Sequence, residues 1–268
     1  MTRFPPRPML LMAAAAAALM VGGAAFAIGA ENYGQTRGEA DEMRAREEIR
    51  QTYRISPRGT VRVRGIAGPV IVETTDGGDT ADVHIVRMAA SERELQCYRT
   101  EISSSPDRLS IEHVQRERER ECRSIRSRQE VRLRVPRSVN LDFSTIAGAL
   151  DVAPVDGMVR ADSIAGHATF ARVRAAEIDS IAGGLTLGVA PDGVEGVRIS
   201  SVVGPVDLNM ETGADADLSV DSVMGSVRSL VEGVDFQENY GTYRARLGSG
   251  RGRVTLSSVV GPVRLRRP

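Results

Sequence analysis

Two stretches of the chain, VRADSIAGHATF at residues 159–170 and AEIDSIAGGLTL at residues 176–187, have the same pattern of apolar and polar residues around an identical DSIAG segment. In both, apolar residues alternate with polar ones on either side of a glycine. Alternation with a period of two predicts a β-strand with one buried face. The glycine has no Cβ atom and is typical of a bend or of a close backbone approach. Each stretch is therefore predicted to be a strand, a bend and a second strand.

The same unit recurs along the chain, and in several copies Ser replaces Asp, Thr replaces Ser or Val replaces Ile. Further copies span residues 61–72, 141–152, 197–208, 218–229 and 254–265. The bend glycines of all seven copies are Gly68, Gly148, Gly166, Gly183, Gly204, Gly225 and Gly261. Between the second and the sixth of these, neighbouring glycines are about 17 to 21 residues apart, a period that suits one coil of a stacked structure.

Stacking of these coils predicts an all-β fold, specifically a single-stranded β-solenoid (β-helix-like) of short repeated strands. Equivalent residues would form inward ladders, one of Ile146, Ile164, Ile181, Val202 and Val223, the other of Leu150, Ala168, Leu185, Val206 and Val227. One coil cannot bury its own apolar face, so stacking would stabilise the fold by roughly 1.5 to 3 kcal/mol per fully buried aliphatic side chain. The competing architecture is a β-sandwich or a pair of open sheets in which the copies are hairpin strands.

The N-terminus has the composition of an export signal. Arg3 and Arg7 precede an apolar run at residues 9–30, and Ala25-Phe26-Ala27 offers a signal-peptidase site. We expect residues 1–27 to be a signal peptide; the alternative is an uncleaved membrane anchor that extends to residue 30. Residues 28–57 are then a charged linker and residues 58–268 the β-strand-repeat domain. This division predicts an exported protein of the periplasm or the cell surface.

Residues 91–135 interrupt the repeats and are predicted to form an insertion. Ser91 with Glu94 makes a capping box ahead of a short helix that would reach about Thr100. Residues 109–115 and 130–135 alternate as strands and together suggest a hairpin. The insertion is thus expected to combine a short helix with a hairpin.

The only cysteines, Cys97 and Cys122, both lie in this insertion. An even count in an exported chain favours one disulfide, and the alternative is two unpaired thiols.

The predicted tip of the insertion alternates arginine with glutamate. In a strand, Arg116, Arg118 and Arg120 would share one face. One interpretation is an anion-binding face for glycans or lipid headgroups; the favoured alternative is a solvated hairpin.

Composition and spacing argue against catalytic chemistry. The 35 basic and 35 acidic residues cancel, so no global field favours nucleic acid or an anionic membrane. His84, His113 and His167 lie in separate segments without metal-ligand spacing and are expected on strand surfaces. Asp162 and Asp179 would lie one strand apart, at about 4.8 Å. A calcium ion could bridge them, but a turn-capping ladder is favoured because Ser replaces Asp freely at this position.

The repeat, with the preceding stretch RISPRGTVRV at residues 54–63, resembles the bacterial putative-adhesin β-strand-repeat domain, also called the toastrack domain. The resemblance covers about residues 53–268. It implies an exported or membrane-tethered stacked-β domain tied to adhesion or to envelope-stress systems, with no catalytic residues and no cofactor. No second membrane segment or sorting signal follows Pro268, which argues against a displayed adhesin.

We therefore expect a non-enzymatic module that binds an envelope component or a protein partner, with membrane contact only through an uncleaved N-terminal segment. One alternative is a self-assembling scaffold, in which an exposed last coil at residues 254–265 pairs with another chain. The other is a carbohydrate-active β-helix enzyme, which would need carboxylates clustered on an outward face.

Overall fold

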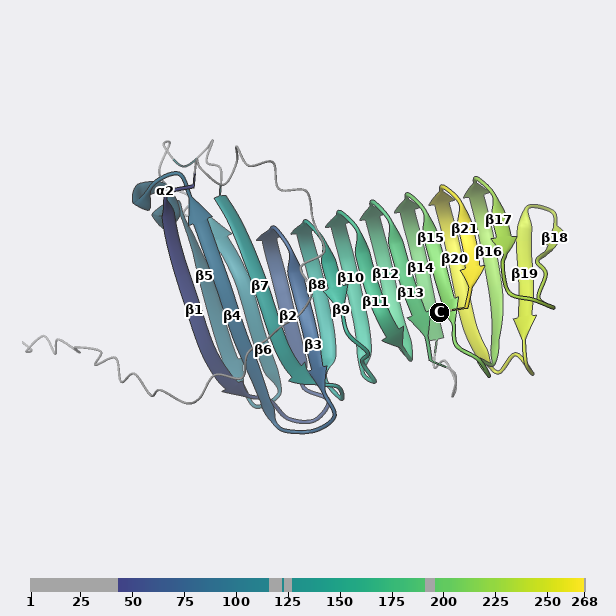
Figure 1. Ribbon diagram of the computed structural model, residues 1–268, viewed down its shortest axis with the longest axis horizontal. Helices are drawn as coiled ribbons and strands as arrows, with labels where there is room; N and C mark the ends of the chain where they lie inside the picture. The colour runs from purple at the N-terminus through teal and green to yellow at the C-terminus, as the bar shows by residue number, and fades with distance from the viewer. Residues whose placement is uncertain (1–42, 116–121, 123–126, 191–195, 268) are drawn as a thin grey trace, which may run out of the picture. The chain divides into compact units, whose positions relative to one another are not determined.

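The computed structural model describes residues 43–115, 122, 127–190 and 196–267, all within one compact unit (Figure 1). The predicted export signal and the arginines at positions 116, 118 and 120 lie outside the described residues. Among the residues described, no helix is both long enough and apolar enough to cross a membrane.

The fold is all-β and consists of two large sheets, here named sheet A and sheet B. Sheet A has the order β1 (Ala45–Arg54), β4 (Thr80–Ala89), β7 (Ser127–Pro136), β3 (Val70–Thr75), β9 (Leu150–Val152), β11 (Ala168–Val173), β13 (Leu185–Val189), β15 (Val206–Met210), β21 (Val263–Arg266) and β17 (Val227–Ser229). Sheet B has the order β18 (Gln237–Asn239), β19 (Thr242–Leu247), β16 (Ala216–Met224), β20 (Gly252–Val260), β14 (Gly196–Val203), β12 (Ala175–Ala182), β10 (Met158–Ala165), β8 (Asn140–Ala147), β2 (Thr60–Ala67), β6 (Arg108–Gln115) and β5 (Tyr98–Ser105). The short helix α2 spans Glu92–Cys97.

Each repeat copy places its first strand in sheet B and its second strand in sheet A. Equivalent strands of neighbouring copies pair in parallel and in register, so Ile164 lies beside Ile146 on one side and Ile181 on the other. The copies therefore do not form hairpins with one another. In Figure 1 the paired strands follow one another along both sheets from β2 and β3 to β16 and β17.

The inward residues of both sheets form one continuous apolar core. The two predicted ladders lie in it, and their members from the copies at residues 141–208 are almost completely buried. Val223 and Val227 are only half buried, because β19 pairs with β16 only as far as Asp221 and no strand lies beyond β17 in sheet A.

The last copy does not lie at the end of the stack. Strand β20 pairs with β14 and β16, and β21 pairs with β15 and β17. The chain first builds β16 and β17, reverses through the antiparallel strands β18 and β19, and returns to insert the last copy (Figure 1, yellow). Both strands of residues 254–265 thus have neighbours on both sides, which corrects the expectation of an exposed last coil.

The insertion also differs from the prediction. Strand β6 pairs with β5 and β2 in sheet B, whereas β7 pairs with β3 and β4 in sheet A. Residues 109–115 and 130–135 therefore belong to different sheets, and the hairpin predicted between them is wrong; the hairpin is β5–β6. The physical reason is that alternation identifies a strand but does not identify its partner.

Helix α2 begins as predicted, since the Ser91 side chain accepts a hydrogen bond from the Glu94 backbone N–H at 3.2 Å. It ends at Cys97, earlier than expected, because the chain continues directly into β5. The predicted disulfide joins Cys97 to Cys122, with the two Cα atoms 5.5 Å apart.

The bend of each copy depends on two positions. Three residues before the glycine, the backbone is left-handed, with φ of 53–56° at Thr145, Ser163, Ser180, Ser201, Ser222 and Ser258. At the glycine itself, the backbone packs on the glycine of the neighbouring copy. A Cβ atom on Gly183 would overlap the carbonyl oxygen of Gly166, and the same holds for the other stacked glycines. The bend glycines are therefore required for the close approach of successive copies.

Candidate binding surface

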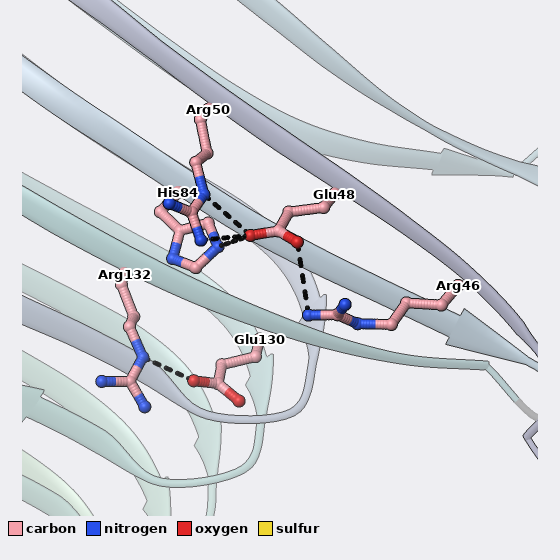
Figure 2. A network of polar contacts seen from close by, with 6 residues as sticks. All are labelled: Arg46, Glu48, Arg50, His84, Glu130 and Arg132. Atoms are coloured by element: carbon pink, nitrogen blue, oxygen red, sulfur yellow. Dashed lines mark hydrogen bonds and ion pairs between the residues drawn. The ribbon is translucent and has the colours of Figure 1, made fainter. Parts of the chain in front are cut away.

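Charged side chains on the outer side of β1, β4 and β7 are joined in pairs and networks. Figure 2 shows six of them: Arg46, Glu48, Arg50, His84, Glu130 and Arg132. The carboxylate of Glu48 accepts a hydrogen bond from Arg50 Nε at 2.7 Å, and His84 Nε2 lies 2.7 Å from the same carboxylate oxygen, Oε1. The hydrogen bond from Arg50, followed by that from His84, lowers the pKa of Glu48 below its ordinary value. His84 is therefore a partner of a carboxylate on the strand surface, as expected.

His113 is partly buried. Its ring stacks on Tyr98 with the centroids 4.9 Å apart, inside the β5–β6 hairpin. Burial, and secondarily the Arg87 guanidinium, lowers the pKa of His113 to about 4. Arg87 donates hydrogen bonds to the carbonyl oxygens of Leu95 and Tyr98, and so provides partners for carbonyl groups at the C-terminal end of α2. This histidine shares the strand face of Leu109 and Ile111, both fully buried, so the alternation within β6 already indicates its inward position.

The predicted aspartate column contains two hydrogen bonds between side chains of neighbouring strands. Asp162 and Asp179 lie opposite each other in register, as expected. Asp179 accepts from the Ser200 hydroxyl at 3.0 Å, and Arg64 Nε donates to the Ser144 hydroxyl at 2.9 Å. Within the described ranges, no three His, Cys, Asp or Glu side chains are placed to hold a metal ion together.

A second outward row of sheet B alternates in charge from one strand to the next. Arg62 pairs with Asp142 at 2.8 Å, and Arg160 pairs with Glu177 at 3.0 Å. The next member is Arg198, and its neighbour on the following strand is Thr255 rather than an acid. The alternation stops here because the next two strands, β20 and β16, have the uncharged Thr255 and Ser219 at this position.

A groove of about 480 Å³ lies at this point and crosses the first residues of β10, β12, β14, β20 and β16. It is lined by Met158, Ala176, Glu177, Gly196, Val197, Arg198, Asp217, Gly250, Arg251, Gly252, Arg253 and Thr255. At Gly196 no atom lies within 4 Å of the place where a Cβ atom would stand. The missing side chain therefore contributes to the hollow.

The turn between β19 and β20, which borders the groove, is fixed by Asp215. Its carboxylate accepts hydrogen bonds from the Arg251 backbone N–H at 3.0 Å, the Ser249 hydroxyl at 2.7 Å and Arg251 Nε at 2.6 Å. These bonds hold the pKa of Asp215 well below its usual range. This side of the groove is thus held in place by a buried, ionised carboxylate.

Three apolar side chains are exposed on neighbouring strands of sheet B, in the position just before the bend glycine. The exposed fractions are 58% for Val203, 46% for Val260 and 74% for Met224. Copies nearer the N-terminus have the smaller Ala165 and Ala182 at this position. Sequence reasoning missed these residues, although aligning the copies on their glycines would have shown the change from Ala to Val and Met.

No protein-family model matches the chain, and no curated protein is similar to it in sequence. Among solved structures, a putative cell adhesion protein from Clostridium sporogenes is similar, with a TM-score of 0.36, 9% identity, and coverage of 83% of this chain and 100% of that one. A putative adhesin from Bacteroides fragilis is similar with a TM-score of 0.36, 10% identity, and coverage of 82% of this chain and 97% of that one.

Proposed function

We propose that the chain is an exported β-solenoid that acts at the bacterial cell envelope as a non-enzymatic interaction module, in the manner of an adhesin. The solenoid interpretation is supported by parallel, in-register pairing of equivalent strands and by one continuous apolar core. Such a stack holds its outward side chains at fixed strand spacings of about 4.8 Å, which suits the display of a rigid contact surface.

The observation that carries this proposal is the outer side of β14, β20 and β16. Elsewhere in sheet B, the outward positions include charge pairs, a column of Asp and Ser residues, and alanines just before the bend glycines. On these three strands the pattern changes to exposed Val203, Val260 and Met224 and to Arg198 without an opposing acid. Stability of the stack does not require these side chains, because they contact solvent rather than the core. Surface features of this kind are typical of a contact site.

Export is supported by the N-terminal basic and apolar residues and by the disulfide. Disulfides persist in oxidising compartments such as the periplasm and are rare in the cytosol. The bond between Cys97 and Cys122 is therefore consistent with a protein of the periplasm or the cell surface.

The proposal is tested by incubating the purified chain with envelope fractions from bacteria, namely cell wall, lipopolysaccharide and membrane protein. We expect saturable retention on one fraction. A triple change of Val203, Val260 and Met224 to serine should weaken that retention, and a control change of Ala147, Ala165 and Ala182 to serine should not. Absence of retention on every fraction, or release of reducing ends from a polysaccharide panel, would overturn the proposal.

A further inference from the structure

The groove at the beginning of the sheet B strands carries an excess of positive charge. Five arginines, at positions 160, 198, 246, 251 and 253, lie in or beside it, together with three carboxylates, at positions 177, 215 and 217. Each carboxylate already has an arginine partner: Glu177 with Arg160, Asp215 with Arg251, and Asp217 with Arg246. Two of the five arginines therefore have no carboxylate partner.

These two are Arg198 and Arg253, both exposed. In the part of the chain that the structure describes, neither guanidinium takes part in a hydrogen bond or an ion pair. Arg198 stands opposite Thr255, and Arg253 stands two residues before Thr255 on the same strand. From strand spacing and rise, their Cα atoms are about 8 Å apart. Their side chains can therefore reach one ligand.

The guanidinium groups suit carboxylate and phosphate oxygens, to which arginine donates two parallel hydrogen bonds. Because the groove crosses five neighbouring strands, it runs for about 19 Å, which suits an extended chain rather than a single small ion. Its lining contains no aromatic residue, so it lacks the stacking platform on which single-stranded nucleic acids bind. The Thr255 hydroxyl donates to the Val197 carbonyl oxygen at 3.3 Å and can still accept a hydrogen bond from a ligand hydroxyl group.

We propose that this groove binds an acidic polysaccharide, with Arg198 and Arg253 holding its carboxylate groups. The inference rests on the proposed function and names the chemical class of its ligand. It also explains why charge alternation ends at β14: the outward row leaves one arginine without an internal partner at the position where the ligand would supply an anion.

The test is isothermal titration calorimetry of the full chain with a polygalacturonate oligosaccharide. We expect saturable binding that weakens with added salt and is absent for the methyl-esterified, neutral form of the same oligosaccharide. The double variant R198Q/R253Q should bind about tenfold more weakly, or worse, because two charge-assisted contacts are lost. The control R228Q/R264Q removes the same charge from sheet A and should bind like the natural chain.

A second variant keeps both arginines. Thr255→Glu would give Arg198 an acidic neighbour, as Arg62 has in Asp142, and should weaken binding by competing with the ligand. Its unfolding temperature checks that the fold persists.

Equal affinity for polyphosphate or single-stranded DNA through the same arginines would overturn the choice of an acidic glycan. Unchanged binding in R198Q/R253Q, or no binding of polygalacturonate at all, would overturn the site. In those cases retention on envelope fractions would continue and the proposed function would stand, whereas loss of all retention would refute the function itself.

Discussion

At the scale of single residues, the least expected feature is the left-handed backbone at six serines and threonines. This conformation costs roughly 1–2 kcal/mol per residue for side chains other than glycine. The first copy avoids the cost, since Gly65 occupies the equivalent position with φ of 73°. The stack therefore holds a repeated local strain that glycine would relieve.

Replacing Ser180 with glycine should stabilise the protein by about 0.5–1 kcal/mol, because relief of strain exceeds the added chain entropy. Chemical unfolding in urea measures the change. The control is Ser257→Gly on β20, at a position without positive φ, which should lose about 0.5–1 kcal/mol. Destabilisation by both substitutions would contradict the assigned bend.

Replacing Gly183 with alanine should destabilise the protein by more than about 3 kcal/mol, because the new Cβ atom would overlap the backbone of Gly166. Gly213→Ala is the matched control: its φ is also positive, at 87°, but no atom lies within 4 Å of the added carbon. The free energy of unfolding of that variant should decrease by only about 1 kcal/mol. Equal decreases in the free energy of unfolding for the two variants would mean that the bend glycines of neighbouring copies do not pack on one another.

His113 predicts a dependence of stability on pH. Its pKa is about 4 in the folded protein and near 6.5 in the unfolded chain, so the unfolded state binds a proton first as pH falls. Stability should decrease as pH falls from about 6.5 to about 4. His113→Phe keeps a ring against Tyr98 and should flatten this part of the profile, as measured by urea midpoints at pH 7.5, 5.5 and 4.5. A variant profile parallel to that of the natural chain would contradict the burial of this histidine.

The repeat identified every bend glycine, because glycine is the residue that a close backbone approach demands. It did not identify the left-handed serines, since serine is common at turns of many kinds. The partial burial of His113 was also missed, although the alternation within β6 places it on the same face as the buried Leu109 and Ile111.

At the scale of elements, the alternation of apolar and polar residues correctly predicted the strands β6 and β7. The predicted pairing of these two strands with each other was wrong. Both strands have one apolar face, and either sheet can bury such a face. Cys122, which lies between these two strands in sequence, forms the disulfide with Cys97. That bond ties α2 and β5 to the segment that leads from sheet B to sheet A.

Removing this bond with Cys97→Ser and Cys122→Ser should lower the free energy of unfolding by roughly 3 kcal/mol, because it closes a loop of 25 residues in the unfolded chain. Urea unfolding of the oxidised chain, the double variant and the reduced natural chain gives the comparison. The urea midpoints of the double variant and of the reduced natural chain should be the same. Equal midpoints for all three would show that the disulfide does not stabilise the fold.

At the scale of the whole molecule, the repeat predicted that copies stack and that their Ile, Val and Leu residues share an interior. It did not predict the order of the stack, because the copies present nearly the same apolar pattern and any of them fits against any other. The order follows instead from the hairpin β18–β19, which covers β16 and returns the chain so that the last copy lies inside the stack.

The order of the last three copies is best tested by nuclear Overhauser contacts between methyl groups of the selectively labelled protein. The structure predicts that the methyl groups of Val259 contact those of both Val202 and Val223, since β20 lies between β14 and β16. Val202 and Val223, two strands apart at about 10 Å, should show no direct contact. Direct contact between Val202 and Val223, with Val259 touching only one of them, would contradict the inserted copy and the groove that depends on it.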